Sequence, residues 1–229
     1  MKRIGILFLC LMLVSCSYSQ PKENPARTPE PVKEIEGFRY FESVQNGIKL
    51  QYPENWTEFN TGDLDDPALL EKLCDMLGVS MNMLLEALSE DTLVVLYDLD
   101  NIKDDMAPSF NVRVSAIEGF TPDMLRDGAA VRELTDFFAQ QFSEMFSGQF
   151  EGESSFTWLK EPSAGEFGNN VFITYSADIS MGEIRQSMYQ ALTAGTDRIF
   201  FFTFSAPLGS FDSGTESLLE MILASVEIE

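Results

Sequence analysis

The sequence contains no histidine among its 229 residues. This absence removes the most common general base of enzymes, the catalytic systems that pair histidine with serine or cysteine, and the usual protein ligand of transition metals. Gly-x-Ser-x-Gly, P-loop and Gly-x-Gly-x-x-Gly patterns are missing as well. Carboxylate pairs could still hydrolyse glycosides, but no pair stands out among 37 acidic residues. We therefore expect a protein that is not an enzyme.

Basic residues are scarce, with 15 lysines and arginines against 37 acids and a formal net charge of −22. Binding to DNA or RNA draws its affinity from the neutralisation of phosphates, so we expect no nucleic-acid partner. Anionic lipid headgroups would repel this surface too. A high net charge keeps an exported domain soluble and monomeric, and a monomer is what we predict.

Cysteine is also rare, and only three occur, at Cys10, Cys16 and Cys74. The first lies in an N-terminal apolar run and the second at the end of that run. Cys74 shares a predicted helix face with several leucines, so it is expected to be a buried apolar residue rather than a nucleophile. If Cys10 belongs to a signal peptide and Cys16 is acylated, no pair remains for a disulfide, and the stability of the domain must come from a packed core.

The N-terminus has the anatomy of a signal peptide: Lys2 and Arg3, eleven apolar residues from Ile4 to Val14, and the small Ser15 before Cys16. Eleven residues are too few to span a bilayer, which takes roughly 20. The run from Leu13 to Cys16 resembles the bacterial lipobox, and this resemblance implies cleavage before Cys16 and a diacylglyceryl thioether on its sulfur. An ordinary secretory signal with an incidental cysteine is the alternative.

The chain then divides into a linker and one domain. Residues 16–37 comprise the lipidated cysteine and a proline-rich disordered tether, because four prolines and few large apolar groups cannot form a core. Residues 38–229 are predicted to form a single domain, of the usual size for one core. Removing residues 1–15 leaves 13 basic residues and a net charge of −24.

Apolar periodicity predicts strands at both ends of this domain and helices between them. Asn46-Gly47 separates two short strands and is a strong hairpin signal. Two helices are expected within 66–89, a strand at 92–97, another at 110–116, and a helix that starts at a Thr121 cap and runs to about residue 147. Four further strands and a short terminal helix complete an α+β fold, an antiparallel β-sheet with helices packed on both faces.

Two motifs connect the domain to a known family. Gly47 precedes a strand that ends with Tyr52, Pro53 and, three residues later, Trp56, and the closing strand and helix end in Ser225-Val226. These motifs resemble the PsbP-like superfamily, which includes photosystem II subunits and bacterial lipoproteins of LpqN or DcrB type. The resemblance implies an α-β-α sandwich over residues 38–229 and brings no catalytic residue, and it does not by itself imply a photosynthetic role.

One acidic loop could bind a cation. Asp98, Asp100, Asp104 and Asp105 follow a buried strand, and oxygen-rich loops suit Ca²⁺. The glycine and the final glutamate of an EF-hand loop are missing, so a solvated turn partly neutralised by Lys103 is the alternative. No other cofactor is expected. The phenylalanine-rich terminal strands could line an apolar ligand pocket, although a core explains them equally well.

These features lead to two functional hypotheses. The first is a non-enzymatic lipoprotein of the bacterial cell envelope, anchored on the extracytoplasmic side, which binds a protein partner or assists envelope assembly. Ser17 is not aspartate, so the outer membrane is expected where the cell has two membranes. The second is a lipoprotein that binds a small ligand or a divalent cation such as Ca²⁺.

Overall fold

The computed structural model describes residues 32–59, 70–71, 74, 91–103, 106–117, 120–148, 154–181 and 184–229. The secondary-structure elements of this part of the chain are β1 (Phe38–Ser43), η1 (Val44–Asn46), β2 (Ile48–Pro53), β3 (Thr57–Phe59), β4 (Thr92–Tyr97), η3 (Leu99–Asn101), β5 (Ser109–Ala116), η4 (Met124–Arg126), α3 (Gly128–Gly148), β6 (Ser154–Phe167), β7 (Asn170–Met181), β8 (Ile184–Gly195), β9 (Arg198–Pro207), α4 (Ser213–Ala224) and β10 (Glu227–Ile228). The helices predicted within 66–89 lie almost wholly outside the described residues. Leu70, Glu71 and Cys74 are helical.

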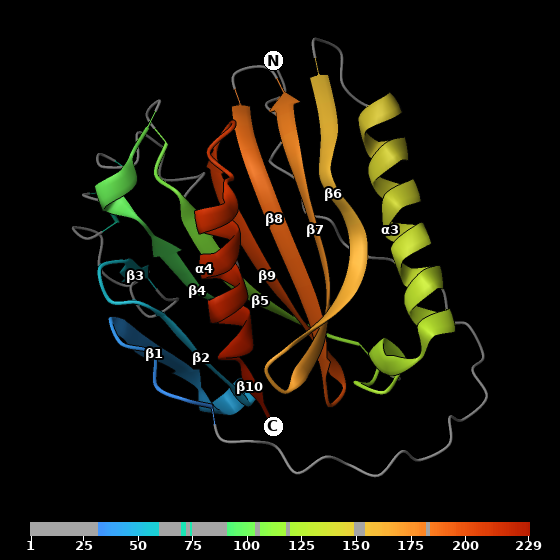
Figure 1. Ribbon diagram of the computed structural model, residues 1–229, viewed down its shortest axis with the longest axis horizontal. Coiled ribbons are helices and arrows are strands. Elements are labelled where there is room, and N and C mark those ends of the chain that lie inside the picture. The colour runs from blue at the N-terminus through green and yellow to red at the C-terminus, as the bar shows by residue number, and fades with distance from the viewer. Residues whose placement is uncertain are drawn as a thin grey trace.

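The described strands form two antiparallel sheets (Figure 1). The small sheet has the order β1-β2-β10, and the large sheet has the order β3-β4-β5-β9-β8-β7-β6. The predicted antiparallel α+β fold is confirmed. A separate small sheet was not predicted, because the two residues of β10 are too few to give a periodic signal.

The small sheet begins with the predicted hairpin. Gly47 has φ +61°, a left-handed conformation that glycine adopts without steric cost, and its N–H donates to Val44 O at 3.2 Å. Phe41 then pairs with Leu50. The end of the chain closes the sheet, since Ile228 pairs with Ile48. Residues from both ends of the domain therefore share one sheet.

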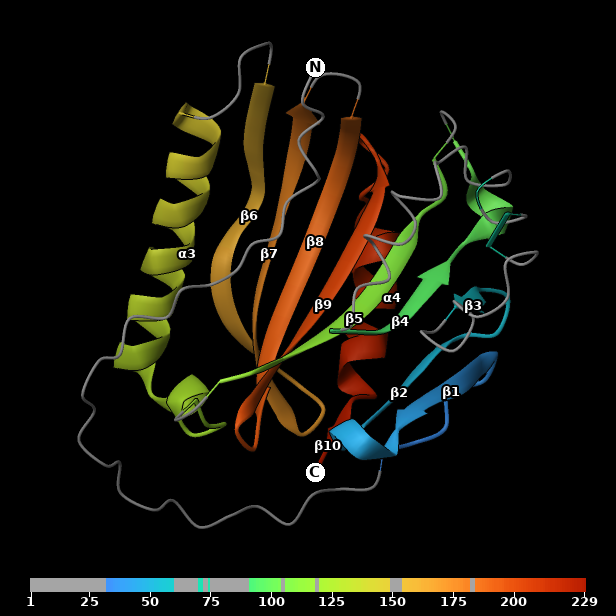
Figure 2. The ribbon, with the colours of Figure 1, turned by 180° about the vertical axis from the view of Figure 1, so that it is seen from behind.

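Two apolar clusters use alternate residues of the large sheet. Phe200, Phe202 and Phe204 of β9 belong to the first cluster, together with residues of the small sheet and of α4. Ile199 and its neighbour Phe201 belong to the second, which includes Phe138 of α3. The sequence predicts this alternation, with Phe200, Phe202 and Phe204 on one side of the strand and the residues between them on the other. In Figure 1, α4 lies in front of the large sheet, and in Figure 2 it lies behind it, whereas α3 runs beside β6 in both.

Helix α4 holds the two sheets together. Its N-cap Asp212 accepts a hydrogen bond from Thr215 N at 2.8 Å, and Leu219, Ile222 and Leu223 are buried. Burial of each such side chain contributes roughly 1.5–3 kcal/mol. After the helix, Ser225 Oγ accepts a bond from Gln51 N of β2 at 2.8 Å. The Ser225 of the family motif thus joins the helix end to the small sheet.

Helix α3 starts later than predicted. Thr121 and Pro122 precede the 3₁₀ turn η4, and α3 begins at Gly128, so a Thr121 cap is wrong. The reason is Asp127, which has an extended backbone and whose Oδ1 accepts a hydrogen bond from Ala129 N at 2.8 Å. Such a side chain caps a new helix at this point. Apolar residues recur along this helix at three- and four-residue spacing, which predicts one apolar stripe. Phe138 of that stripe is buried, as predicted.

Strand β6 is twice as long as predicted. The pattern indicates an end near Glu161, but the strand continues through Pro162 to Phe167. A proline is tolerated there because β6 is an edge strand, whose outer N–H groups need no partner in the sheet. The following turn is tight: Gly168 has φ +59°, and a Cβ on it would lie 2.3 Å from Ala224 O of α4.

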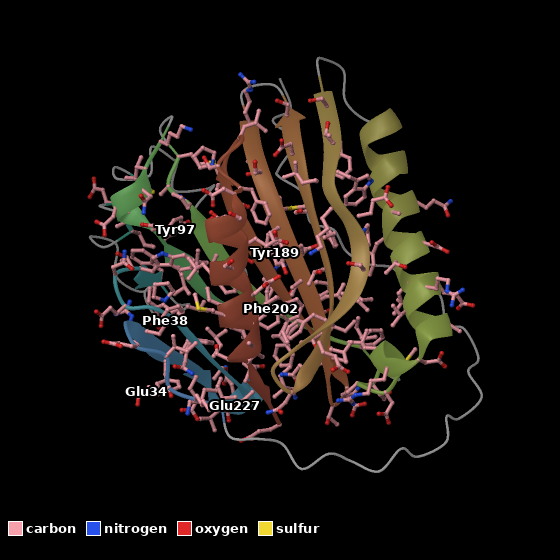
Figure 3. All side chains as sticks on the ribbon, in the orientation of Figure 1. Glu34, Phe38, Tyr97, Tyr189, Phe202 and Glu227 are labelled. Atoms are coloured by element: carbon pink, nitrogen blue, oxygen red, sulfur yellow. The ribbon has the colours of Figure 1, made fainter. Side chains whose placement is uncertain are left out.

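The segment before β1 is bound to the small sheet. Gln51, fully buried, accepts a hydrogen bond from Ile35 N at 2.8 Å and donates one to Lys33 O at 2.9 Å. Glu34, between them, lies at the outer side of this sheet (Figure 3). We call residues 33–35 the strap. The domain boundary at residue 38 stays a prediction, and no helix in the described part is long and apolar enough to cross a membrane.

Candidate functional site

The predicted acidic loop borders a cleft with a volume of about 400 Å³. The cleft lies between the connection from β4 to β5, the end of β9 and the first turns of α4, and we call it the loop cleft. Its lining residues are Trp56, Asp98, Asn101, Lys103, Pro108, Phe204, Ala206, Ser210, Gly214, Thr215 and Leu218.

Aromatic packing fixes the floor of the loop cleft. The chain turns after Pro53, where Trp56 N donates to Pro53 O at 3.1 Å, and this turn directs the indole into the core. The Trp56 ring is stacked on Phe204, with centroids 6.4 Å apart, and it lies 6.3 Å from the Phe110 ring. Arg39 also donates to Trp56 O at 2.6 Å. The floor is therefore apolar and held in place by aromatic packing and hydrogen bonds.

The polar rim comes partly from the start of α4. Thr215 donates to Asp212 Oδ1 with both its N–H, at 2.8 Å, and its hydroxyl, at 3.0 Å. These hydrogen bonds to the charged form lower the pKa of Asp212. The carboxylate of Asp212 therefore serves as a helix cap and fixes Thr215 at the edge of the cleft.

The structure separates the predicted cation ligands. Asp98 Oδ2 accepts a hydrogen bond from Asn101 Nδ2 at 2.8 Å, and Asp100 Oδ2 accepts one from Asn55 Nδ2 at 3.2 Å. Asp104 and Asp105 lie outside the described residues. Within the described ranges, no three His, Cys, Asp or Glu side chains form a group that could hold a metal ion. The Ca²⁺ site stays a prediction.

Asp98 nonetheless has an unusual environment. Its Oδ1 atom is buried and has no hydrogen-bond partner in the described structure. A buried carboxylate oxygen without a donor costs free energy, because it has lost water and gained nothing in return. A ligand in the loop cleft that carries an N–H, an O–H or a positive charge would remove this cost.

A second cleft, of about 420 Å³, lies where the two sheets meet. We call it the seam cleft. Its lining residues are Tyr40, Phe41, Glu42, Ser43, Gln45, Asn46, Glu58, Thr92, Leu93 and Val114. Tyr52, beneath it, donates its hydroxyl to Glu58 Oε2, and burial together with the Glu58 charge raises the pKa of Tyr52. Tyr52 therefore stays protonated and donates to Glu58, which lines the cleft.

Two cysteines bear on the predictions. Cys16 lies outside the described residues, so its lipidation stays a prediction. Cys74 is a free thiol on a helical residue of intermediate exposure, which is less buried than expected for a core position.

Sequence reasoning missed the seam cleft entirely. Glu42 belongs to β1 and Glu58 to β3, in different sheets, so no spacing in the chain brings them to one cleft. The loop cleft had a partial signal, since Asp98 and Asn101 follow a buried strand. The contributions of Trp56 and α4 to that cleft come from tertiary packing.

Comparison with known proteins identifies the fold alone. The chain is similar to the solution structure of the cyanobacterial PsbP protein CyanoP from Synechocystis sp. PCC 6803, with a TM-score of 0.52 and 14% identity over 90% of this chain and all of that one. A crystal structure from Bacteroides thetaiotaomicron VPI-5482 aligns with a TM-score of 0.45 and 14% identity, over 85% of this chain and 49% of that one. No family model and no curated sequence matches. The fold is therefore PsbP-like.

Proposed function

We propose that this chain is a lipid-anchored, non-enzymatic protein of the bacterial cell envelope that binds a protein partner on the extracytoplasmic side. The observation that carries the binding role is the loop cleft, which joins an aromatic floor to the unpartnered Oδ1 of Asp98. An apolar side chain with a polar end fits this combination, because it covers Trp56 and Leu218 and donates to Asp98.

The anchor is proposed from Cys16 and from the way the chain enters the domain. Gln51 holds the strap, which lies at the end of the proposed tether, against the small sheet, so the tether leaves the domain from a fixed place. Two acyl chains on a glyceryl group, with a third on the amine, hold a protein firmly, whereas one chain binds only marginally. Outer-membrane sorting, through Ser17, is part of this proposal.

The anchor is tested by detergent phase partition of the chain expressed in a bacterium. The Cys16→Ser variant is expected to move to the aqueous phase, because no acyl chain can be attached. Cys10→Ser is the matched control, since it changes a cysteine within the signal and should leave partition unchanged. If Cys16→Ser stays in the detergent phase, the chain is not held by a lipid on that residue.

The binding role is tested with a variant that fills the cleft. Leu218→Trp places a bulky side chain in the loop cleft, and Met221→Trp, at an exposed site on the same helix, is the control. Crosslinking on intact cells should yield a partner with the parent chain and with Met221→Trp, and lose it with Leu218→Trp. A partner retained by all three would not use the loop cleft.

Binding of a divalent cation is the second candidate function. It is favoured by the buried Oδ1 of Asp98, which has no hydrogen-bond partner among the described residues. Calorimetric titration with CaCl₂ is the test. Heat that is lost in Asp98→Asn would support the site, and no heat at roughly millimolar Ca²⁺, the weak end of protein sites, would exclude it.

We also infer that helical layers cover both faces of the large sheet, as in an α-β-α sandwich. Support comes from the separate apolar clusters of α4 and α3. A monomeric state is proposed from the net charge of −22, which opposes self-association.

A further inference from the structure

We propose that the free edge of β1 takes up an extended, lysine- or arginine-rich segment of a partner protein, which adds to the small sheet as a further strand. This inference rests on the proposed binding of a protein partner, and it names the chemistry of that partner at a second site, the seam cleft.

The first step is the identity of the free backbone groups. β1 is the outer strand of the order β1-β2-β10, so one of its edges has no strand beside it in the described structure (Figure 1). Glu54 N donates to Gly37 O at 2.9 Å. This hydrogen bond joins the residues next to the pair of Phe38 and Pro53. In an antiparallel ladder this pattern makes that pair a non-hydrogen-bonded one.

Hydrogen-bonded and non-hydrogen-bonded pairs alternate along an antiparallel ladder, so this first pair determines the type of all the remaining ones. Tyr40 with Gln51, and Glu42 with Lys49, are non-hydrogen-bonded pairs like the first. The N–H and C=O groups of Tyr40 and Glu42 therefore point away from β2. Phe38 N is already satisfied by Ile35 O at 3.2 Å, so Tyr40 and Glu42 present the free groups of this edge.

The second step is the position of that edge at a cleft. Four consecutive residues, Tyr40 to Ser43, line the seam cleft. Since successive side chains of a strand point to opposite faces, four in a row share one surface only along the strand edge. The opposite wall comes from β3, β4 and β5 of the large sheet. The free backbone groups thus border a space of about 420 Å³ that can receive an extended chain.

The third step is charge. Glu42 and Glu58 are the charged side chains among the described residues that line the cleft, and neither lysine nor arginine is among these residues. Glu42 is exposed and Glu58 is half-buried. Lys49, opposite Glu42 in the ladder, lies over the Tyr40 ring at 4.3 Å and outside the lining. Basic side chains of an added strand would meet both carboxylates.

The other long free edge of the described sheets is unsuitable. β6 is an edge strand of 14 residues, but Pro162 interrupts its N–H groups and its register shifts on both sides of Lys160. Proline, lysine and bulges are the features by which proteins block strand addition. β1 has a regular register from Phe38 to Ser43 and carries none of these blocks.

The test uses the full chain in detergent, three peptides and two variants of the chain. The probe is an acetylated and amidated octapeptide of alternating threonine and lysine. One comparison peptide has glutamate in place of lysine. The other is the threonine–lysine peptide itself with every backbone amide N-methylated, so that it cannot donate backbone hydrogen bonds. The chain variants are Glu42→Gln with Glu58→Gln as a double substitution, and Glu54→Gln, an exposed residue outside the cleft, as the matched control for charge.

Fluorescence titration is expected to show the lysine peptide binding at least tenfold more tightly than the glutamate peptide. The double substitution should weaken binding by about fivefold, the size expected for two charge pairs that water reaches, and Glu54→Gln should change nothing. Thermal unfolding of each variant checks that the fold is intact.

Hydrogen exchange measured by NMR gives a readout at the edge itself. The bound lysine peptide should slow exchange of the Tyr40 and Glu42 amides by at least tenfold, because these two become hydrogen-bonded. Equal binding by the N-methylated peptide would show attraction by charge alone and overturn the inference. Unchanged exchange at saturation, or no binding at roughly millimolar peptide, would overturn it as well. The proposed function is tested separately, at the loop cleft. If Leu218→Trp loses the crosslinked partner, the proposed function stands even where one of these results overturns strand addition at β1.

Discussion

Substitution of Gly168 by alanine should destabilise the domain more than the same substitution at another left-handed glycine. Gly168 has φ +59° in the turn between β6 and β7, and it sits against the last residue of α4. The contact is reinforced by Asn170, which donates to Val226 O at 2.7 Å. The turn thus locks the hairpin onto the helix end that joins the two sheets.

The expected cost has two parts. A Cβ in the left-handed region costs about 1–2 kcal/mol. The new methyl would also lie 2.3 Å from Ala224 O and 3.1 Å from Ala224 C, which are backbone atoms of a helix and cannot rotate away. Relief of such overpacking costs about 1–3 kcal/mol. We therefore expect Gly168→Ala to lower the free energy of unfolding by about 2–5 kcal/mol.

Gly209→Ala provides the control. Gly209 has φ +73°, and a Cβ on it would meet nothing within 4 Å, so this variant suffers the conformational cost alone. Urea unfolding at 25 °C, followed by tryptophan fluorescence with an unchanged m-value, measures both variants. A Gly168→Ala variant that loses no more stability than Gly209→Ala would show that the hairpin does not press on α4, and would refute the reasoning.

Two more predictions concern the strap and the buried tyrosines. Gln51→Leu should release the strap, because Ile35 N and Lys33 O lose their partners, and should lower the free energy of unfolding by about 1–3 kcal/mol. Trypsin should then cleave after Lys33 several times faster. An unchanged rate would show that Gln51 does not hold the segment. Burial raises the pKa of Tyr97 from 10.0 to about 12, and it raises the pKa values of Tyr175 and Tyr189 as well. Since the unfolded chain loses these protons first, this contribution to the free energy of unfolding should be fully present below pH 10. It should decrease between pH 10 and 12 by about 1.4 kcal/mol per pH unit for each such tyrosine. In urea unfolding at several pH values, Tyr97→Phe should make this decrease less steep, and an identical slope would contradict the assignment.

The sequence predicts correctly the elements that depend on neighbouring residues, and it fails where residues far apart in the chain decide the structure. The Asn46-Gly47 turn, the apolar run of β4 and the alternation of β5 and β9 are local signals, and the structure has those elements where the patterns put them. The start of α3 was misplaced because Thr121 and Asp127 are both suitable caps, and only packing selects between them. The full length of β6 was missed because proline ends most strands, and its tolerance depends on an edge position that no local pattern reveals.

The site shows the same division more strongly. Asp98 and Asp100 were identified from their place after a buried strand, yet their hydrogen bonds to Asn101 and Asn55 depend on how the loops meet. Glu42 and Glu58 carried no signal, because a charged residue in a strand is ordinary wherever one side of the strand faces water.

The sequence by itself determined the composition-level properties of this protein. The absence of histidine, the net charge of −22 and the longer strands follow from residue types and their spacing, which act over a few residues. Only the tertiary structure decided that the two ends of the domain share a small sheet, that one edge of β1 has no strand beside it among the described residues, and that the seam and loop clefts exist. These features arise from contacts between residues far apart in the chain. Such contacts depend on the shape of the whole core, and periodicity does not record it.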